Sequence, residues 1–329
     1  MTPKISVIIP AYNAEKTIEK TLNAVLSQKF SKNKFEVIVV DDESTDNTIN
    51  IIKKFKKVKL ITKKHGGPAS SRNLGVKKSK GKIILFTDSD CVPKKNWIKE
   101  MIGPFDNKKV AAVAGTYETL NNDFFMARFA GYEIGLRHQN MKKLDSIDFV
   151  GTYNCAFRKS IFLKYGGFNE SFKQASGEDP ELSFRIRESE KKIVFQPKSI
   201  VYHNHPDSLT KYLKQKYNRA FWKVLLYSYH PKKMFGDAYT PKTLFPQILI
   251  TGLSIILFFL GFFYHFFFYV SFIFLFVSLL LNYDFYSFVW EKEKSMVVIS
   301  PFIFLLRNII SIVAIIHGGI HFLFKKFNF

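Results

Sequence analysis

The stretch Lys82-Ile83-Ile84-Leu85-Phe86-Thr87-Asp88-Ser89-Asp90 places two carboxylates directly after a run of apolar residues. A short apolar run that ends in polar residues is typical of a buried strand in a parallel sheet. We therefore expect a strand over residues 82–86. In open α/β sheets ligands bind beyond the carboxyl ends of the strands. The stretch thus predicts that Asp88 and Asp90 lie at a binding site.

Three earlier segments have the same apolar character, and segments with helical spacing separate them. The expected strands cover residues 5–9, 35–40 and 58–61; the helices between them carry Ile18, Leu22, Val25 and Leu26, then Ile49, Ile52 and Phe55. Strands that alternate with helices in this way predict a doubly wound α/β sheet. Asp41-Asp42 ends the second strand, so this pair is expected at the same sheet edge as residues 88–90.

The order is less regular between Val110 and Tyr202. Further strands are expected near residues 110–115, 154–158 and 193–195, with helices near residues 124–137 and after Pro180. We expect residues 1–208 to form one α/β domain, because no low-complexity linker interrupts them.

From about Leu244 onward Phe, Leu, Ile and Val dominate the chain. Three segments are each long enough to cross a hydrocarbon layer ~30 Å thick; they cover residues 244–263, 265–283 and 297–324. The third contains Pro301, Arg307, Asn308 and His317, which predict a kinked, tilted or partly re-entrant segment. Three crossings from a cytosolic N-terminus would leave Lys325-Lys326 outside, against the positive-inside bias. The sequence leaves the topology open.

The formal net charge is +22, of which residues 1–239 carry +19. A basic domain suits nucleic acid, anionic lipid headgroups or phosphorylated substrates. The apolar tail favours the lipid surface, and the lack of a nucleic-acid recognition motif argues against nucleic acid. Basic and aromatic residues alternate over residues 209–233, which indicates an interfacial segment, with a helix packed on the α/β domain as the alternative. The expected division is 1–208, 209–240 and 241–329.

Cys91 and Cys155 lack metal-ligand spacing and are too few for a disulfide framework, so both are interpreted as packing residues in a reducing compartment. The short apolar run up to Pro10 is predicted to be a strand and not a signal peptide. We expect an integral plasma-membrane protein whose N-terminal domain faces the cytoplasm.

The pair Asp88 and Asp90 can share a hard divalent cation, which neutralises a diphosphate; a simple turn is the alternative, since Asp-x-Asp is common by chance. Asp42 can accept hydrogen bonds from a nucleobase or ribose, or can cap a helix. Glycines before a helix allow close backbone approach, so Gly67 and Arg72 are candidates for nucleotide phosphates. The sequence contains no G-x-G-x-x-G or G-x-x-x-x-G-K-[ST] motif, which argues against a dehydrogenase or a P-loop ATPase.

Two later segments carry further candidates. Gly177-Glu178-Asp179-Pro180-Glu181 places acids before a helix, where an Asp can deprotonate a hydroxyl or can only stabilise the helix end. His203 and His205 are expected on one face of a strand that begins near Ser199, where either can complete a metal shell, touch phosphates or serve the structure alone.

In this order the segments resemble the family 2 glycosyltransferases of the GT-A fold, over residues 4 to about 225. The matching motifs are Val7-Ile8-Ile9-Pro10-Ala11-Tyr12-Asn13, Val39-Val40-Asp41-Asp42-Glu43-Ser44-Thr45-Asp46, Ser71-Arg72-Asn73-Leu74-Gly75, Asp88-Ser89-Asp90, Gly166-Gly167-Phe168-Asn169-Glu170 and Glu178-Asp179. The resemblance implies a nucleotide cradle, a Mg²⁺ or Mn²⁺ site and an Asp base. The residues implied are Pro10, Ala11, Tyr12, Asn13 and Asp42 for the nucleotide, Asp88 and Asp90 for the metal, and Asp179 for the base. The candidates named from the residues themselves complete these sets: Gly67, Arg72 and Ser89 for the nucleotide, and His203 and His205 for the metal.

The resemblance also implies inversion at the anomeric carbon. Processive members carry a Gln-x-x-Arg-Trp motif, whose nearest equivalent here is Gln215, Arg219 and Trp222 with altered spacing. These residues and Glu178 are candidates for acceptor or phosphate contacts. The altered spacing favours addition of a single sugar over processive synthesis.

The leading hypothesis is transfer from a UDP- or GDP-linked sugar to a polyprenyl or dolichyl phosphate, or to a lipid-linked oligosaccharide. The alternatives are a processive synthase, a nucleotidyltransferase, and a non-catalytic membrane scaffold or nucleotide sensor. A nucleotidyltransferase would need a Gly-rich loop near the first strand, which residues 10–13 do not offer. No motif reports which sugar is moved.

Overall fold

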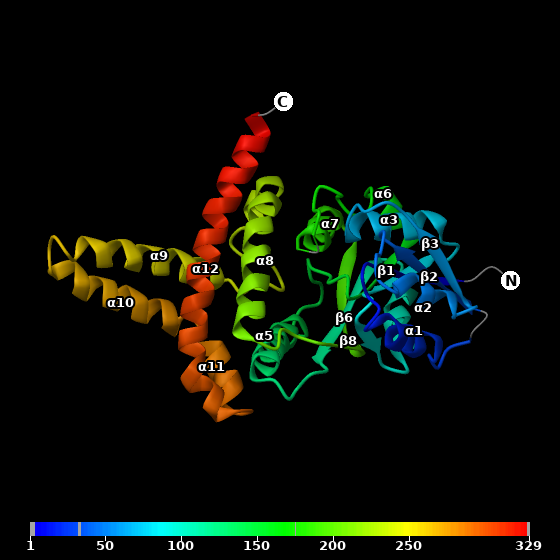
Figure 1. Cartoon of the computed structure of the whole chain (residues 1–329), viewed down its shortest axis with the longest axis horizontal. Coiled ribbons are helices and arrows are strands. Elements are labelled where there is room, and N and C mark those ends of the chain that lie inside the picture. The colour runs from blue at the N-terminus through cyan, green and yellow to red at the C-terminus, as the bar shows by residue number, and fades with distance from the viewer. Residues whose placement is uncertain (1–3, 32–33, 175, 328–329) are drawn as a thin grey trace. The chain divides into compact units, whose positions relative to one another are not determined.

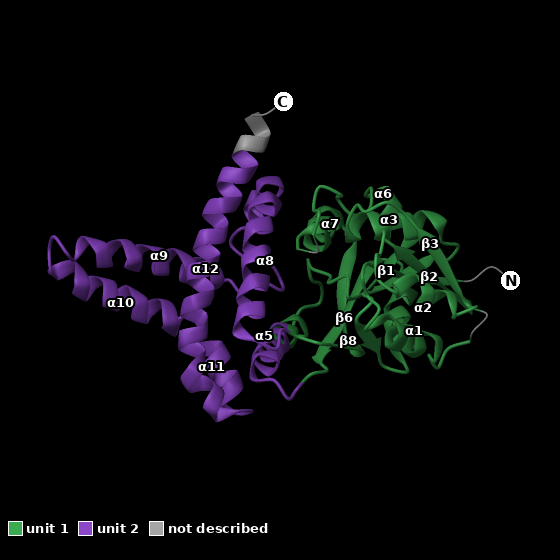
Figure 2. Ribbon diagram, in the orientation of Figure 1, with its two compact units in different colours: residues 1–121, 138–205 green, residues 122–137, 206–329 purple. Residues whose placement is uncertain are grey.

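The computed structural model of the protein describes residues 4–31, 34–174 and 176–327. The chain divides into two compact units (Figure 1, Figure 2). Unit 1 comprises residues 1–121 and 138–205, and unit 2 comprises residues 122–137 and 206–329. The division differs from the expected one because residues 122–137 group with the C-terminal part of the chain.

Unit 1 is built on a mixed sheet, which contains eight strands among the described residues. The strands in spatial order are β3 (Val58–Thr62), β2 (Phe35–Asp41), β1 (Ile5–Ala11), β4 (Ile83–Thr87), β7 (Asn154–Arg158), β6 (Val110–Thr119), β8 (Lys192–His203) and β5 (Cys91–Pro93). The first four are parallel, as predicted. The predicted α/β fold is confirmed, and the rest of the sheet is mixed: β7 runs antiparallel to both β4 and β6, whereas β6 and β8 are parallel.

Helices pack on the sheet of unit 1. They are α1 (Ile18–Leu26), α2 (Thr48–Lys53), α3 (Pro68–Lys78), α4 (Trp97–Ile102), the 3₁₀ turn η2 (Gly103–Asp106), α6 (Lys159–Lys164) and α7 (Glu178–Arg187). Of these, α1, α2 and α7 lie where helices were expected, whereas α4, η2 and α6 were not predicted. All seven residues of β1 are buried, as expected of a central parallel strand. The register pairs Ala11 with Asp41 and Asp41 with Thr62, so three strands end at the same level. The loops that follow them therefore meet at one edge.

Unit 2 is helical in its described residues. Its helices are α5 (Phe125–Met141, whose last turn belongs to unit 1), α8 (Leu209–Tyr229), the 3₁₀ turn η3 (Pro231–Lys233), α9 (Leu244–Leu260), α10 (Phe266–Leu280), α11 (Tyr283–Trp290) and α12 (Lys294–Phe327). Phe129 of α5 is fully buried against Tyr212, Phe285 and Phe304. This aromatic packing is the reason why residues 122–137 belong to unit 2.

The apolar tail contains a candidate membrane anchor. Among the described residues, Lys294–Leu323 of α12 is the one helical segment that is long and apolar enough to cross a membrane by itself. The pair of α10 and α11 meets the same criterion jointly but is bent by 51° at its break, and α9 is apolar but shorter. Length and composition thus single out α12.

Candidate active site

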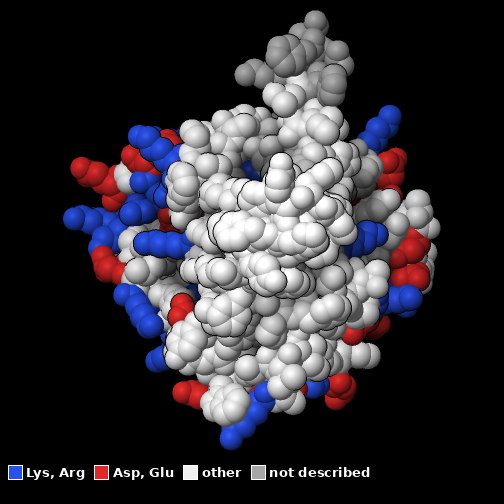
Figure 3. Space-filling view, turned by 90° about the vertical axis from the view of Figure 1, so that its left-hand side faces the viewer, with Lys and Arg blue, Asp and Glu red and all other residues white. Residues whose placement is uncertain are grey.

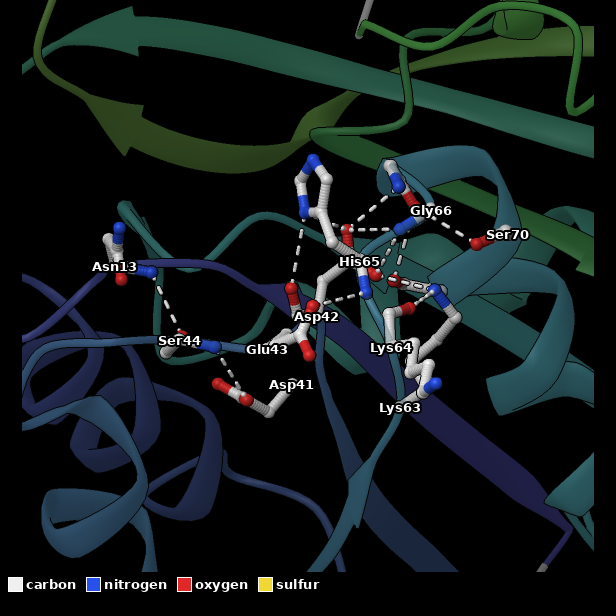
Figure 4. Close-up of polar contacts among 12 residues, drawn as sticks. Asn13, Asp41, Asp42, Glu43, Ser44, Lys63, Lys64, His65, Gly66 and Ser70 are labelled. Carbon is white, nitrogen blue, oxygen red and sulfur yellow. Dashed lines mark hydrogen bonds and ion pairs between the residues drawn. The ribbon is translucent and has the colours of Figure 1, made fainter.

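Asp42 follows β2, and its carboxylate is held by the loop between β3 and α3 (Figure 4). Lys63 Nζ lies 2.5 Å from Oδ1, and the N–H group of Gly67 donates to Oδ2 at 2.8 Å. His65 Nδ1 lies 3.1 Å from Oδ2. Burial acts to raise the pKa of Asp42, but the hydrogen bonds from Lys63, Gly67 and Gly66 outweigh it and lower the pKa. Asp42 is therefore ionised and fixes this loop.

The neighbouring Asp41 has a different role. It is fully buried, and its Oδ2 accepts the N–H group of Ser44 at 3.0 Å. Asp41 thus shapes the turn after β2, while Asp42 faces residues 63–67. The ligand contact expected of Asp42 stays a prediction.

Residues 10–13 continue β1 into a loop that is tied to the turn after β2. The N–H group of Asn13 donates to Ser44 Oγ at 2.9 Å, and Asn13 Oδ1 accepts the N–H group of Thr45 at 2.8 Å. Tyr12 is half exposed, and the centre of its ring lies 4.7 Å from that of His65. Pro10 and Ala11 are buried in the strand. Tyr12 and His65 thus form an aromatic surface close to Asp42.

Gly67 stands where only glycine fits. Its φ is +89°, and a Cβ atom there would lie 2.7 Å from the carbonyl oxygen of Lys173. A side chain would therefore be strained by the backbone conformation and would also clash with backbone. The close approach positions the N–H groups that hold Asp42 and the start of α3.

Arg72 of α3 connects two acids that come from distant parts of the chain. Its Nη2 donates to Asp88 Oδ1 at 2.7 Å, and its Nη1 donates to Glu178 Oε1 at 2.8 Å. The guanidinium is fully buried, and although burial acts to lower the pKa of Arg72, Asp88 and Glu178 raise it. Arg72 therefore joins the end of β4 to the start of α7. Its predicted contact with a phosphate stays a prediction.

Asp90 is paired with the end of β8. His203 Nε2 lies 2.8 Å from Asp90 Oδ2. Burial acts to raise the pKa of Asp90, and the interaction with His203 outweighs it and lowers the pKa. Asp90, Cys91 and His203 place one potential ligand atom each within 4.8 Å of one another. Burial raises the pKa of the Cys91 thiol, which disfavours the thiolate that a metal requires.

The donors at this position fit a divalent cation. Asp90 offers carboxylate oxygen and His203 offers imidazole nitrogen, which are ligands of Mn²⁺ and, for the oxygen, of Mg²⁺. His203 Nδ1 is buried and has no hydrogen-bond partner among the described residues. The second carboxylate, Asp88, is held by Arg72. The centre of the His205 ring lies 5.7 Å from that of His203, beyond the end of β8.

Asp179 lies at the start of α7, next to Glu178. Its Oδ2 accepts the N–H group of Thr152 at 3.4 Å. Burial, followed by the negative charge of Glu178, raises the pKa of Asp179 well above its ordinary value, and Arg72 opposes the shift only in part. Glu178 is itself buried, and its Oε2 accepts the N–H group of Ser176 at 3.1 Å and that of Gly177 at 3.2 Å. Asp179 can take up a proton, whereas Glu178 anchors the helix.

The remaining candidates divide between the two units. Ser89 lies between Asp88 and Asp90, and its carbonyl oxygen accepts a hydrogen bond from Thr21 at 2.9 Å, which fixes the turn after β4 to α1. Gln215, Arg219 and Trp222 lie on α8 in unit 2. Their acceptor and phosphate contacts stay predictions.

Sequence reasoning missed two features of the site. Lys63 directly follows β3, and the rule that named the acids after β2 and β4 would have found it. Tyr117 and Tyr153 stack with ring centres 4.0 Å apart, and the Tyr117 ring lies 4.8 Å from that of His203. Their spacing along the chain gives no signal for this aromatic pair, because β6 and β7 bring the rings together through tertiary packing.

Residues 6–166 match the family model described as Glycosyl transferase family 2. Over 228 residues the chain is 30% identical to the probable glycosyltransferase YdaM of Bacillus subtilis (strain 168), covering 65% of this chain and 54% of that protein. Over 128 residues it is 34% identical to WfgD of Escherichia coli, whose name is UDP-Glc:alpha-D-GlcNAc-diphosphoundecaprenol beta-1,3-glucosyltransferase, covering 38% of this chain and 50% of that protein. The chain thus spans about half the length of these relatives.

A solved structure resembles nearly the whole chain. It is the mannosyltransferase PcManGT from Pyrobaculum calidifontis in complex with GDP-Man and Mn²⁺, with a TM-score of 0.62 and 17% identity. The likeness covers 99% of this chain and 88% of that chain. At this identity it shows the fold, a mixed α/β domain of the GT-A type with C-terminal helices.

Proposed function

We propose that this chain, whose residues 6–166 match the family model described as Glycosyl transferase family 2, transfers one sugar from a nucleotide-diphosphate sugar to a lipid-linked acceptor. One observation carries the proposal. Arg72 binds both Asp88, next to the candidate metal ligands, and Glu178, next to the candidate base. The groups needed for departure of the diphosphate and for activation of the acceptor therefore belong to one site.

The donor nucleotide is assigned to the loops after β1, β2 and β3. The exposed Tyr12 ring and His65 offer an aromatic surface for a base. The ionised Asp42 offers an acceptor for the N–H groups of a base or the hydroxyls of a ribose. Asn13 and Gly67 hold these loops in place. UDP is the favoured nucleotide, because the relative WfgD is named for a UDP-sugar.

Asp88, Asp90 and His203 are assigned to a Mg²⁺ or Mn²⁺ ion. When bound, such an ion neutralises negative charge on the diphosphate. The protein contributes the orientation of these ligands: Arg72 fixes Asp88, and Asp90 and His203 fix each other. His205 lies two residues after His203, and its ring packs edge-on against that of Tyr117. We assign it a supporting role there.

Asp179 is assigned the role of general base. A carboxylate with a raised pKa is a better proton acceptor at neutral pH than an ordinary one. A phosphate acceptor is already ionised and needs no base, so the raised pKa of Asp179 favours an acceptor hydroxyl. The name of WfgD describes transfer to a sugar on diphosphoundecaprenol, which supports the same class of acceptor. Direct displacement by that hydroxyl inverts the anomeric carbon.

The setting of the reaction is assigned to the cytoplasmic face of the plasma membrane. The candidate anchor α12 and the basic helix α8 support a place at the lipid surface, where a lipid-linked acceptor is concentrated. The altered spacing of Gln215, Arg219 and Trp222 supports release after one sugar.

The test is an assay of the purified full-length protein with a panel of UDP- and GDP-linked sugars, scored by free nucleotide diphosphate. The expected result is release from one donor that increases when a lipid-linked oligosaccharide is added and stops when divalent cations are chelated. Silence across the panel would favour a non-catalytic scaffold or sensor instead.

A further inference from the structure

The apolar helices of unit 2 point in two directions. α9 and α10 form a hairpin, joined by hydrogen bonds from Thr251 to Ser278 at 2.7 Å and between Ser254 and Ser271 at 3.2 Å. Figure 1 shows this hairpin projecting sideways from α12, while α8 runs beside α12. Asn308 of α12 binds Thr251 near the base of the hairpin. One bilayer normal cannot follow both the hairpin and α12.

α8 packs against the C-terminal half of α12. Tyr217 hydrogen-bonds His317, and the Trp222 ring lies 5.7 Å from that of Phe322. Between these two contacts, a Cβ atom added at Gly318 would lie 2.9 Å from the carbonyl oxygen of Phe221, so the two helices approach closely there. An α12 that crossed the bilayer would therefore draw α8 into the hydrocarbon. The basic residues of α8 are Lys211, Lys214, Lys216, Arg219 and Lys223. Ammonium and guanidinium groups at bilayer depth are costly and need a polar environment.

A group of polar side chains marks the base of the hairpin. Arg307 of α12 hydrogen-bonds Gln247 of α9, and its Nη1 lies 3.7 Å from Glu133 Oε1 of α5. Lys216 of α8 donates to Glu133 Oε2 at 2.7 Å. Close to Asn282, α10 gives way to α11 with the bend of 51°. Such a cluster of charged and amide groups fits the headgroup region and not the middle of a bilayer.

Beyond this base the hairpin is apolar on its outer surface. The sequence contains no Asp, Glu, Lys or Arg over residues 243–283. The exposed side chains of the distal half include Ile256, Phe259, Phe262, Phe263 and Phe272. Figure 3 shows the molecule from the side on which the hairpin projects, and the centre of this view shows few Lys, Arg, Asp or Glu residues. From Gln247 to Leu260 a helix rises about 20 Å. Together with the turn that connects α9 to α10, the hairpin is long enough to extend through most of a hydrocarbon layer of ~30 Å.

α12 has the pattern of a helix that lies in a membrane surface. Most of its exposed apolar residues lie on one stripe, Val298, Phe302, Ile309, Val313, Ile316, Ile320 and Leu323, and the exposed Ile299 and Ile315 lie on either side of it. The opposite side is buried against the protein and is partly polar, with Ser300, Arg307, Ser311 and Gly318. One apolar stripe and one protein-bound face suit a helix whose stripe contacts acyl chains from above.

We propose that the α9–α10 hairpin is the element inserted in the bilayer, and that α8 and α12 lie in the plane of its surface. The partner of the hairpin and of the α12 stripe is the acyl layer, and the partner of Lys211 and Lys214, the exposed basic residues of α8, is the anionic headgroups. A hairpin returns to the side on which it begins. The C-terminal end of α12, with Lys325 and Lys326, therefore stays on the same side of the membrane as the N-terminus, in accord with the positive-inside bias.

The depth of single sites tests the proposal. Spin labels are attached to full-length Val298→Cys, Ile309→Cys, Ile320→Cys and Phe272→Cys variants in vesicles of phosphatidylcholine and phosphatidylglycerol. The unmutated chain, whose two cysteines are buried, serves as the background. Relaxation by oxygen and by a water-soluble nickel chelate reports depth. The three α12 sites should have one shallow depth, and Phe272 should be deeper than all of them. A deepest position at Ile309, with residues 298 and 320 at opposite surfaces, would overturn the proposal.

A second measurement fixes the side of the C-terminus. A cysteine appended after Phe329 is treated with a membrane-impermeant thiol reagent in intact cells and in inverted vesicles. Labelling in inverted vesicles alone is expected, together with the same result for Leu163→Cys, an exposed site in unit 1. Labelling of the appended cysteine in intact cells would mean that α12 crosses the membrane, and the proposal would fail.

Discussion

Asp88 and Glu178 accept hydrogen bonds from the same side chain, the buried guanidinium of Arg72, at 2.7 and 2.8 Å. One acid follows β4 and the other begins α7, so this contact fixes the distance between two halves of the site. In the proposed reaction, departure of the nucleotide belongs to one half and activation of the acceptor to the other. Arg72 is thus a positioning residue, and its loss should affect both.

Arg72→Met should reduce stability and activity together. Removing one partner of a buried ion pair leaves uncompensated charge and costs about 3–5 kcal/mol. Arg72→Lys keeps the charge but cannot reproduce the fork geometry, so an intermediate loss is expected. Urea unfolding and sugar transfer per folded protein are the measurements, with Arg187→Met on α7 as the matched control. Equal stability of Arg72→Met and Arg187→Met would contradict this role.

Asp179→Asn should lower kcat by about 10²–10⁴-fold, the range expected for loss of a general base, with little change in KM for the donor. In the unmutated protein, kcat/KM should rise as the pH rises through the raised pKa of Asp179, because the base must lose its proton first. A pH profile of the two proteins checks both statements. An unchanged rate for Asp179→Asn on a hydroxyl acceptor would remove this residue from the chemistry.

Asp179→Asn should lower activity but raise the stability of the folded protein. A carboxyl whose pKa is raised on folding binds its proton more tightly in the folded state, so it lowers stability as the pH rises. Asp179→Asn removes that cost. The variant should therefore unfold at a higher temperature than the unmutated protein at pH values above the raised pKa, and thermal unfolding over a pH series measures it. A lower unfolding temperature throughout would show that the carboxylate is stabilised rather than strained.

Asp42→Asn should weaken donor binding and remove a pH-dependent part of the stability. Hydrogen bonds to a charged group contribute about 1.5–3 kcal/mol each, so the donor KM should rise by roughly 10–100-fold. Because the pKa of Asp42 is lowered on folding, its contribution is present above the unfolded-state pKa and is lost as the pH falls through the folded-state value. The stability difference between the two proteins should therefore vanish in acid. Kinetics and unfolding at several pH values check these points, and a constant difference would contradict them.

Asp90→Asn and His203→Ala should each weaken Mn²⁺ binding, by about 10–100-fold for loss of a ligand or its partner. His205→Ala should change it little, because His203 is the histidine whose ring nitrogen lies with the ligand atoms of Asp90 and Cys91. Titration of each protein with Mn²⁺, followed by electron paramagnetic resonance, separates the two histidines. A larger loss for His205→Ala than for His203→Ala would reverse the assignment.

The first half of the sheet can be predicted from the sequence, because β1, β2 and β4 are apolar runs and because acids follow β2 and β4. This pattern alone places Asp42, Asp88 and Asp90 at the ends of strands that share one sheet. It does not predict the antiparallel direction of β7, since short strands carry no signal of direction. The pairing of Arg72 with Glu178 is also out of reach, because α3 and α7 meet only through tertiary packing.

The membrane region shows the same limit. Hydropathy identifies apolar segments of sufficient length, and it favours α12 on this ground. The orientation of a helix depends on its tertiary contacts. A hydropathy average over neighbouring residues does not report the contacts of α12 with α8. Pro301, Arg307, Asn308 and His317 indicate in the sequence that α12 differs from α9 and α10.

The acids at positions 42, 88, 90 and 179 are proposed to serve a single glycosyl-transfer site. Transfer of a radiolabelled sugar from a nucleotide diphosphate to a lipid-linked oligosaccharide by the purified protein, compared with Asp90→Asn and Asp179→Asn, tests this most directly. Labelled lipid product is expected with the unmutated chain and almost none with either variant, while both variants stay folded. Product formation that neither substitution reduces would contradict the proposal.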